Sequence, residues 1–457
     1  MSRLIRVLTA LLCVTAAVIY FLPPPAGATA ATMHAAALIV LTIGLWALGA
    51  VPEHFTALVF FLLAVVLAIA SPQVVFSGFA SATMWLVLGG LLIAEAVGVT
   101  GLGRRFAGVL FGRFTQSYAG LLAEVAVAGT VLAFFMPSTV GRILLLVPIV
   151  MALAERVGFA RGSNGCNGLC IMAIMISYQS GNGILPANVP NVVLTGATEA
   201  LYGVHLIYAE WMWVMFPVLC FLKGIVMVVL THRIFPARME PQAPLPVSAP
   251  MSAEERRLAL ILLIALILWV TDFLHGVRAG WIALAAAVAC LMPRIGVLPA
   301  KAFDDVRFGS FFYIGAAIGV GAIVTESGLS ELLGKTLQNS LNTQPGADFT
   351  NFMVMSLFAT AVGLITTNPA QPAVMAPLAA QFAEAAGWPL NAALMTVAIG
   401  FTTMILPYQI PPVVVGLRAA GISIPTVLRV ALPLAAISIV VMLPLEYLWW
   451  RLIGYFG

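Results

Sequence analysis

The stretch "FMPSTVGRILLLVPI" at residues 135–149 decides the fold, because it puts a proline and an arginine inside a segment otherwise apolar enough to lie in a lipid bilayer. Proline interrupts the hydrogen bonding of a helix. An arginine at the centre of a membrane costs about 2.5–3.5 kcal/mol on insertion scales, so Arg142 is a functional candidate by default. The stretch predicts a helical hairpin whose tip, near Pro137, lies within the membrane.

The composition of the whole chain agrees with this interpretation. Of the 457 residues, 62% are hydrophobic and only 8% are charged, which excludes a soluble globular protein. One crossing takes about 20 residues, so the apolar segments fit roughly ten or eleven crossings with short loops. The net charge of +4 does not indicate a nucleic-acid partner, because in a membrane protein the position of the basic residues matters more than their sum. The expected surroundings are membrane lipid.

Two further features of the chain have alternative interpretations. Residues 1–22 fit a cleaved signal peptide or a retained first helix, and the length of the apolar run favours the helix. The cysteines have no metal-ligand spacing, so we interpret them as small apolar side chains: Cys13, Cys166, Cys170, Cys220 and Cys290.

Two predicted hairpins determine the topology. The hairpin at 119–153 has basic flanks, which places both its ends in the cytoplasm; these flanks contain Arg104, Arg105, Arg113, Arg156 and Arg161. The hairpin at 351–383 has only Lys335 beside it and is expected to enter from outside. This topology puts the N-terminus in the cytoplasm, the C-terminus outside and most of the 21 Lys and Arg residues on the cytoplasmic side.

The chain also repeats itself. Residues 84–102, "MWLVLGGLLIAEAVGVTGL", resemble residues 311–329, "FFYIGAAIGVGAIVTESGL", and each is followed by a hairpin and then a long interrupted helix. We therefore predict an N-terminal repeat at 1–236, a cytoplasmic linker at 237–257 and an inverted C-terminal repeat at 258–457. Inverted repeats with broken helices are typical of secondary transporters.

Four segments break the apolar helices. The hairpin tips are "PSTVGR" (137–142) and "TTNPAQP" (366–372), and the interrupted helices, at 166–194 and 389–416, contain "SGNGILPANVPN" (180–191) and "LPYQIPP" (406–412). Each break could be a simple proline kink, but four breaks in two matched pairs favour a binding site. Helix N-termini that restart there favour an anion, and unwound carbonyls favour a cation.

At this point the chain resembles the divalent anion/sodium symporter family, which carries dicarboxylates, citrate or sulfate. The resemblance extends over nearly the whole length. It rests on "ALIVLTIGLWALGAVPEHFTALVFFLLAVVL" (37–67), on the glycine-bearing helices at 84–102 and 311–329, and on "ANVPN" (187–191) and "YQIPP" (408–412), which stand where the family has Thr-Pro-Pro-Asn-like stretches. It implies an all-α polytopic membrane protein, an inverted-repeat transporter with about 11 transmembrane helices and two re-entrant hairpins, working as a homodimer.

The resemblance also implies site residues. The family carries Ser-Asn-Thr at both hairpin tips, where this chain has Ser138-Thr139-Val140 and Thr367-Asn368-Pro369. Expected anion contacts are Ser138, Thr139, Arg142, Asn188, Asn191, Thr367, Asn368 and Gln409. Expected contributors to a sodium site are Ser138, Gly183, Thr367 and Pro407. Sodium is the candidate coupling ion, and no organic cofactor is expected.

Arg142 separates this chain from the family. One hypothesis is that its guanidinium supplies a fixed positive charge near the place of a family sodium ion and holds the anion directly. The alternative is a structural ion pair with Glu95. Coupling by sodium, coupling by protons through Glu95 and simple exchange are the alternatives. Lys223 is interpreted as snorkelling or paired, and Glu124 and Glu446 as interfacial or as neutralising a neighbour.

The sequence contains no nucleotide-binding or metalloprotease motif, so an enzyme is not expected. We predict a transporter of a small dianion across the plasma membrane. The alternatives are an arsenite or monoanion permease of the wider superfamily and a non-transporting membrane sensor on the same fold.

Overall fold

The computed structural model describes residues 3–110, 117–239, 250–341 and 343–457, and these residues form helices and connecting turns without a β-strand among them. Arg113 and residues 240–249 of the predicted linker lie outside the described residues. Eight continuous helical spans of the described residues, two of them with a π-helical segment inside, are at least 18 residues long and apolar enough to cross a membrane. The prediction of an all-helical membrane protein is therefore confirmed.

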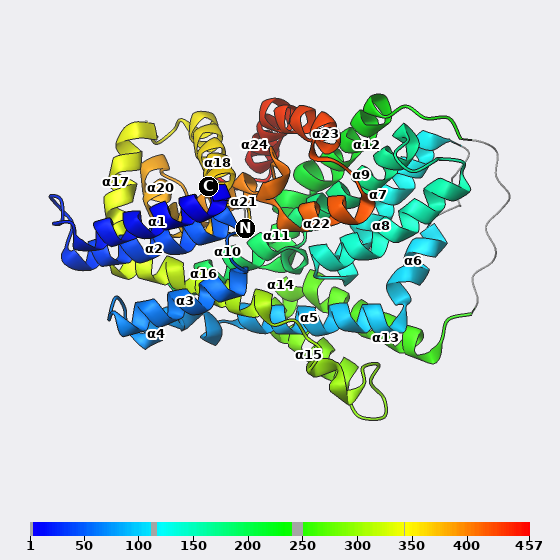
Figure 1. The fold of residues 1–457 in the computed structure, drawn as a ribbon, viewed down its shortest axis with the longest axis horizontal. Coiled ribbons are helices and arrows are strands. Elements are labelled where there is room, and N and C mark those ends of the chain that lie inside the picture. Colours follow the sequence, from blue (N-terminus) through cyan, green and yellow to red (C-terminus); the bar gives the residue numbers. More distant parts are fainter. Residues whose placement is uncertain (1–2, 111–116, 240–249, 342) are drawn as a thin grey trace.

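The chain begins with a group of helices that precedes the repeated elements. These are α1 (Arg3–Phe21), α2 (Ala30–Leu48), α3 (Glu53–Val66), α4 (Pro72–Val75) and the 3-10 turn η1 (Ser77–Ala80). Helices α1 and α2 run side by side across the left part of the view in Figure 1, with α17 above them and α3 below. The side chain of Thr29 caps α2 by accepting from the amide of Thr32.

The first series of elements runs from a long helix to a helix with a π-helical segment. It consists of α5 (Ala82–Thr100), α6 (Leu102–Leu110), α7 (Tyr118–Phe135), α8 (Thr139–Arg156), α9 (Asn164–Gln179), the 3-10 turns η2 (Ser180–Gly183) and η3 (Leu185–Ala187), α10 (Val189–Tyr202), α11 (Tyr208–Phe216), the π-helical η4 (Pro217–Leu222) and α12 (Lys223–Ile234). Helices α7 and α8 are adjacent arms joined by a three-residue turn.

Four elements connect this series to the next. They are α13 (Ala253–Val270), α14 (Asp272–His275), α15 (Ala279–Leu291) and the 3-10 turn η5 (Ala300–Phe303). Helix α15 packs along α5, and Gly280 makes this possible: a Cβ at that position would lie 2.0 Å from the carbonyl oxygen of Ala82.

The second series follows the order of the first. It consists of α16 (Gly309–Glu326), α17 (Leu329–Leu341), α18 (Asp348–Ile365), α19 (Gln371–Met375), the 3-10 turn η6 (Ala376–Leu378), α20 (Ala379–Ala386), α21 (Leu390–Gly400), the 3-10 turn η7 (Pro407–Gln409), α22 (Pro411–Ala420), α23 (Ile424–Ile437), the π-helical η8 (Ser438–Met442) and α24 (Leu443–Leu452). Each series thus has a long helix, a short helix, a helical pair, an interrupted helix and a helix with a π-helical segment.

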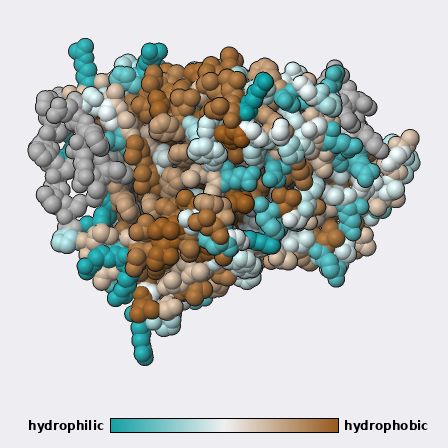
Figure 2. All heavy atoms as spheres, turned by 180° about the vertical axis from the view of Figure 1, so that it is seen from behind, coloured by the Kyte–Doolittle hydropathy of each residue, from teal (hydrophilic) through white to brown (hydrophobic). Residues whose placement is uncertain are grey.

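The buried apolar side chains form two clusters. One is built mainly from α7, α8, α9, α22 and α23, and the other from α3, α5, α10, α13, α15, α16, α18 and α21. On the outside, apolar side chains gather over a broad area of the face in Figure 2, as expected of a surface that contacts lipid. Side chains at the breaks belong to both clusters: Ile184, Leu185 and Phe401 to one, and Met404 and Ile410 to the other.

Candidate functional site

The first hairpin turns at Met136, Pro137 and Ser138. Helix α7 ends at Phe135, and Pro137 cannot continue it because proline lacks an amide hydrogen. The Ser138 hydroxyl accepts from the amide of Gly141 at 3.1 Å and so caps α8. The hairpin tip therefore presents the first turn of α8, with amides that the helix itself does not use.

The first interrupted helix is braced by its own amide side chains. The Asn191 Nδ2 donates to the carbonyls of Gly181 and Ile184 at 2.8 and 3.0 Å, and the Asn188 Nδ2 donates to the Asn182 Oδ1 at 2.6 Å. The Trp211 indole donates to the Asn182 carbonyl at 2.9 Å. These bonds satisfy backbone groups that lipid could not.

Arg142 joins the hairpin tip to this break. Its side chain is fully buried and donates to three backbone carbonyls, those of Met136, Ser177 and Ala187. The bonds to Ser177 and Ala187 measure 2.7 and 3.0 Å. Its Nη2 also lies 3.2 Å from the Thr139 hydroxyl. The guanidinium thus occupies the place where the carbonyls freed by the hairpin tip and the break converge.

The ion pair with Glu95 does not form. Glu95 is partly exposed on α5, and no hydrogen bond or ion pair joins it to Arg142. All the bonds of the buried guanidinium go to neutral oxygens. Its positive charge is therefore not cancelled by a carboxylate in direct contact.

The second hairpin tip and break are joined by Asn368. Its backbone amide donates to the Gln409 carbonyl at 2.8 Å, and its Nδ2 donates to the Phe401 carbonyl at 2.7 Å and to the Tyr178 hydroxyl at 3.0 Å. The Gln409 Nε2 lies 3.2 Å from the Asn368 Oδ1, and its Oε1 accepts from the amides of Ile405 and Leu406, each at 2.8 Å. A neutral amide thus joins the second tip to its break, whereas a guanidinium joins the first.

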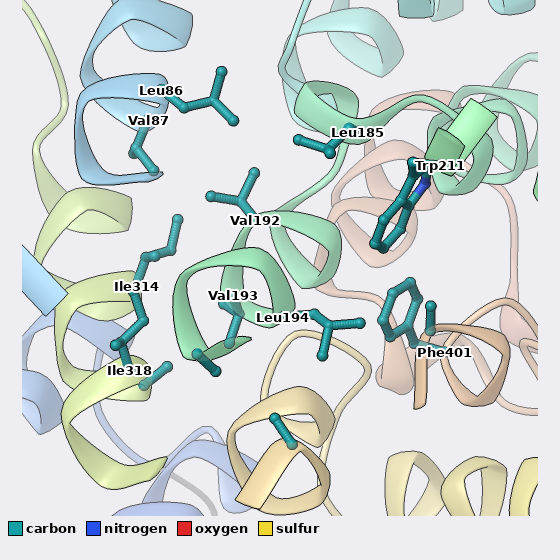
Figure 3. Packing of buried hydrophobic residues seen from close by; sticks show 14 of the residues in the cluster. Leu86, Val87, Leu185, Val192, Val193, Leu194, Trp211, Ile314, Ile318 and Phe401 are labelled. Carbon is teal, nitrogen blue, oxygen red and sulfur yellow. The ribbon is translucent and has the colours of Figure 1, made fainter. Parts of the chain in front are cut away.

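A central cavity of about 370 Å³ lies between the two tips. The first turns of three helices line it, at Thr139 and Val140 of α8, Asn188 and Val189 at the start of α10, and Pro411 and Pro412 of α22. Its apolar wall comes from Leu86, Val87, Val192 and Ile314, whose side chains point toward one another between α5, α10 and α16 (Figure 3). Two opposite charges, Glu53 and the exposed Arg307, also line the cavity.

The predicted residues divide into two groups. Those that line the cavity are Ser138, Thr139 and Asn188. Those buried behind it are Arg142, Gly183, Asn191, Thr367, Asn368, Pro407 and Gln409. Sequence reasoning missed Tyr178, Tyr313 and Arg307 among the lining residues. Arg307 had a visible signal, because it stands four residues before the predicted helix at 311–329.

Several of the carbonyls freed at the two breaks already accept hydrogen bonds from side chains. At the first, the carbonyls of Met136, Ser177 and Ala187 already accept from Arg142. At the second, those of Phe401 and Thr402 accept from Tyr178, Asn368 and Lys223. Three buried side-chain oxygens near the breaks have no hydrogen-bond partner among the described residues: the Asn191 Oδ1 at the first break, the Gln371 Oε1 at the second hairpin tip and the Thr403 Oγ1 at the second break.

The chain was compared with known proteins. The family model described as the sodium:sulfate symporter transmembrane region matches residues 3–456. A membrane protein of Cupriavidus necator is 26% identical over 96% of this chain and 91% of its own length. The sodium-dependent dicarboxylate transporter SdcS of Staphylococcus saprophyticus is 22% identical over 88% of this chain and 83% of its own.

Among solved structures, the YdaH transporter of Alcanivorax borkumensis superimposes with a TM-score of 0.57 at 17% identity, over 83% of this chain and 87% of that one. The MtrF structure of Neisseria gonorrhoeae, described as illuminating a class of antimetabolite efflux pumps, gives the same TM-score at 15% identity, over 96% and 97% of the two chains. These likenesses show a shared transporter fold.

Proposed function

Because the chain belongs to the sodium:sulfate symporter family, a family of integral membrane transporters, we propose that it is a secondary transporter of a small dianion across the plasma membrane by alternating access. The substrate class is a dicarboxylate, citrate or a sulfate-like dianion. The SdcS relatives are named as dicarboxylate transporters and the matching family model as a sulfate symporter region, so both chemistries belong to the proposal.

One observation carries this proposal: the N-terminal turns of α8 and α10 meet at one cavity with the hydroxyl of Thr139 and the amide of Asn188. Unpaired amides and the positive ends of helix dipoles favour an anion. Arg142 lies directly behind Thr139 and adds a positive charge that no contacting carboxylate cancels. The charge therefore acts on the anion across the hairpin tip, while Ser138, Thr139 and Asn188 make the contacts.

The remaining predicted residues have supporting roles in this proposal. Asn368 and Gln409 hold the second hairpin tip against the second break, and Asn191 holds the first break in shape. The Thr367 carbonyl accepts from the amides of Ala370 and Gln371 and so shapes the second tip itself. Arg307 lies exposed at the cavity and attracts the anion from the aqueous side. Coupling to sodium, expected from the family, is replaced at the first break by the guanidinium of Arg142.

The proposed topology has eleven crossings and two re-entrant hairpins, formed by α7 with α8 and by α18 with α19 and α20. The N-terminus is cytoplasmic, the C-terminus is outside, and the repeats at 1–236 and 258–457 have opposite orientations around the linker at 237–257. The matched order of the two series of elements supports this arrangement. A homodimer remains part of the proposal through the family resemblance.

The test is a thermal-stability screen of the purified protein with succinate, citrate, sulfate, arsenite and monoanions such as nitrate, followed by flux in proteoliposomes. We expect a dianion to stabilise the protein and to be transported, and Thr139→Val to weaken its binding by about tenfold, the equivalent of one hydrogen bond. Thr130→Val is the control, because the Thr130 hydroxyl bonds only to Ala126 within α7.

Three outcomes would contradict the proposal. Binding of a dianion without flux would indicate a sensor. Stabilisation by monoanions or arsenite alone would indicate another branch of the superfamily. Equal affinity in the Thr139→Val and Thr130→Val variants would remove the hairpin tip from the site.

A further inference from the structure

Lys223 is a second buried cation that the proposed function leaves without a role. Its side chain is only 1% exposed. It follows the π-helical segment η4 and stands at the start of α12. Buried lysines are rare without a carboxylate partner, yet no carboxylate of the described residues forms an ion pair with it.

The partner of Lys223 is a backbone carbonyl of the second break. Its Nζ donates to the carbonyl oxygen of Thr402 at 2.8 Å, across 179 positions of sequence. Thr402 stands directly after Phe401, whose carbonyl accepts from Asn368 and Tyr178. Lys223 therefore contacts the second break much as Arg142 contacts the first, as a cation held by freed carbonyls.

The two cations differ in their chemistry. A guanidinium stays protonated in proteins, whereas a lysine in a buried site can release its proton. An ammonium has three N–H donors, and the Thr402 carbonyl takes one of them. The second break is thus held by a group whose charge can change, and the first by a group whose charge cannot.

A small cavity beside Lys223 can hold a water molecule that accepts the proton of the ammonium. About 10 Å³ of space, roughly the room of one water molecule, lies beside Lys223. Its polar lining consists of Lys223, Tyr178, Gln179 and Ser438. Tyr178 also lines the central cavity, and its hydroxyl contacts the hairpin residue Asn368. One side chain therefore separates the lysine from the proposed anion site.

Other titratable or charged groups lie on the elements that pack against α12. They are Tyr118 and Glu124 of α7, Cys166, Cys170 and Tyr178 of α9, Cys220 of η4 and Arg429 of α23, with Glu446 on α24 beyond η8. Cys220 stands three residues before Lys223, and its Sγ donates to the Gln179 carbonyl at 3.2 Å. The Glu446 carboxyl accepts from the Trp450 indole at 3.0 Å and is not an ion-pair partner of the lysine.

From this geometry we propose that Lys223 is the proton-carrying group of the transport cycle, an inference that rests on the proposed function. The ammonium balances the charge of the bound dianion. After the anion leaves, one N–H bond breaks, the electron pair stays on nitrogen, and the proton passes by way of water and Tyr178 to the central cavity. The contact with Thr402 weakens, which loosens the second break and its hairpin tip. The transporter is therefore a proton–anion symporter at this site.

The test compares wild type, Lys223→Arg and Lys223→Met in proteoliposomes with sodium-free choline buffers. The probes are labelled succinate and sulfate, with a pH-sensitive dye inside the vesicles. With the outside more acidic than the inside, wild type should accumulate the anion and acidify the lumen. The guanidinium of Lys223→Arg does not release its proton, so this variant should neither accumulate the anion nor acidify the lumen. It should still exchange one anion for another. Lys301→Arg, at an exposed position, is the matched control.

Two results would overturn the inference while leaving the proposed function intact. One is that Lys223→Arg accumulates the anion under the pH gradient as well as wild type does. The other is that transport by wild type does not depend on the pH gradient. If wild type moves no anion, the proposed function fails instead, and melting curves across pH decide about the lysine. If the melting temperature changes with pH in wild type but not in either Lys223 variant, Lys223 is still supported as a proton site. If the same pH dependence persists in the variants, Lys223 is excluded as that site. Lys223→Met also tests whether the charge is needed for folding.

Discussion

The two helix breaks solve the same physical problem with different side chains. Each break frees carbonyls inside the protein, and each needs donors to satisfy them. The first uses one guanidinium, that of Arg142. The second uses the amide of Asn368, the hydroxyl of Tyr178 and the ammonium of Lys223. Duplicated architecture therefore does not imply duplicated chemistry.

The register of the repeat makes this difference sharper. When Pro148 of the first hairpin is aligned with Pro377 of the second, Arg142 is aligned with Gln371. Gln371 is fully buried, its Nε2 donates to the Val397 carbonyl at 3.2 Å, and its Oε1 has no hydrogen-bond partner in the described chain. A permanent charge in one half thus corresponds to a neutral amide in the other.

Replacing Arg142 by Gln should have the largest effect, because it gives the first break the side chain of the second. Three carbonyls would lose their donor, and we expect a loss of about 3 kcal/mol in stability together with weaker anion binding. Thermal melting of the purified protein, with and without sulfate or succinate, measures both. Unchanged anion affinity would show that the guanidinium has no part in binding.

The smaller variant Arg142→Ala tests whether the guanidinium stands in for a metal cation. In this variant the carbonyls of Met136, Ser177 and Ala187 have lost the guanidinium that donates to them, and the space it filled is free. If a sodium ion binds there, sodium should stabilise the variant more than the wild type. Melting in sodium chloride and in choline chloride measures the difference. An equal response of the two proteins to sodium would mean that these carbonyls do not form a cation site.

Replacing Asn368 by Leu should have the next largest effect, by separating the second hairpin tip from its break. The leucine has a similar size but cannot donate to Phe401 and Tyr178 or accept from Gln409, and we expect a loss of about 2 kcal/mol. Asn391→Leu, on a half-buried residue of α21 that makes none of these contacts, is the control for melting experiments. Equal melting temperatures of the two variants would contradict the assigned role.

Gly181→Ala should disturb the first break without changing its charge. A Cβ at Gly181 would lie 2.8 Å from the Nη2 of Arg142, so the guanidinium must move away from its carbonyls. We expect a loss of about 1–2 kcal/mol by thermal melting. Gly224→Ala, inside helix α12, is the control, because the nearest atom to its new Cβ is 3.7 Å away. Since alanine favours a helix more than glycine does, this variant should be neutral or slightly stabilising. A larger loss of stability in Gly224→Ala than in Gly181→Ala would contradict the close packing of Gly181 against the guanidinium.

The smallest effect is expected at the end of the first interrupted helix. Glu199 of α10 lies 2.6 Å from the Arg278 guanidinium and accepts from the Ala82 amide at the start of α5. The pair is partly exposed, so Glu199→Gln should cost less than about 1 kcal/mol, and the loss should shrink in high salt. Melting at two salt concentrations checks this, with the exposed Glu155→Gln as the control. A larger, salt-independent loss would place this pair among the buried contacts.

Local patterns in the sequence predicted much of the fold. Prolines and glycines within apolar runs placed the breaks near 180–191 and 406–412, where the structure has the 3-10 turns η2, η3 and η7. They work because a missing amide or Cβ acts on the nearest turn of the chain. The π-helical segments η4 and η8 were not predicted, since they depend on packing and have no simple sequence signal.

The sequence by itself determined that this chain is helical, lies in a membrane and carries Arg142 beside a proline break. Only the tertiary structure decided what Arg142 and Lys223 contact. Arg142 meets carbonyls 35 and 45 positions away, and Lys223 meets one 179 positions away. A buried cation takes whichever oxygens the fold brings within about 3 Å, and sequence spacing does not encode that distance.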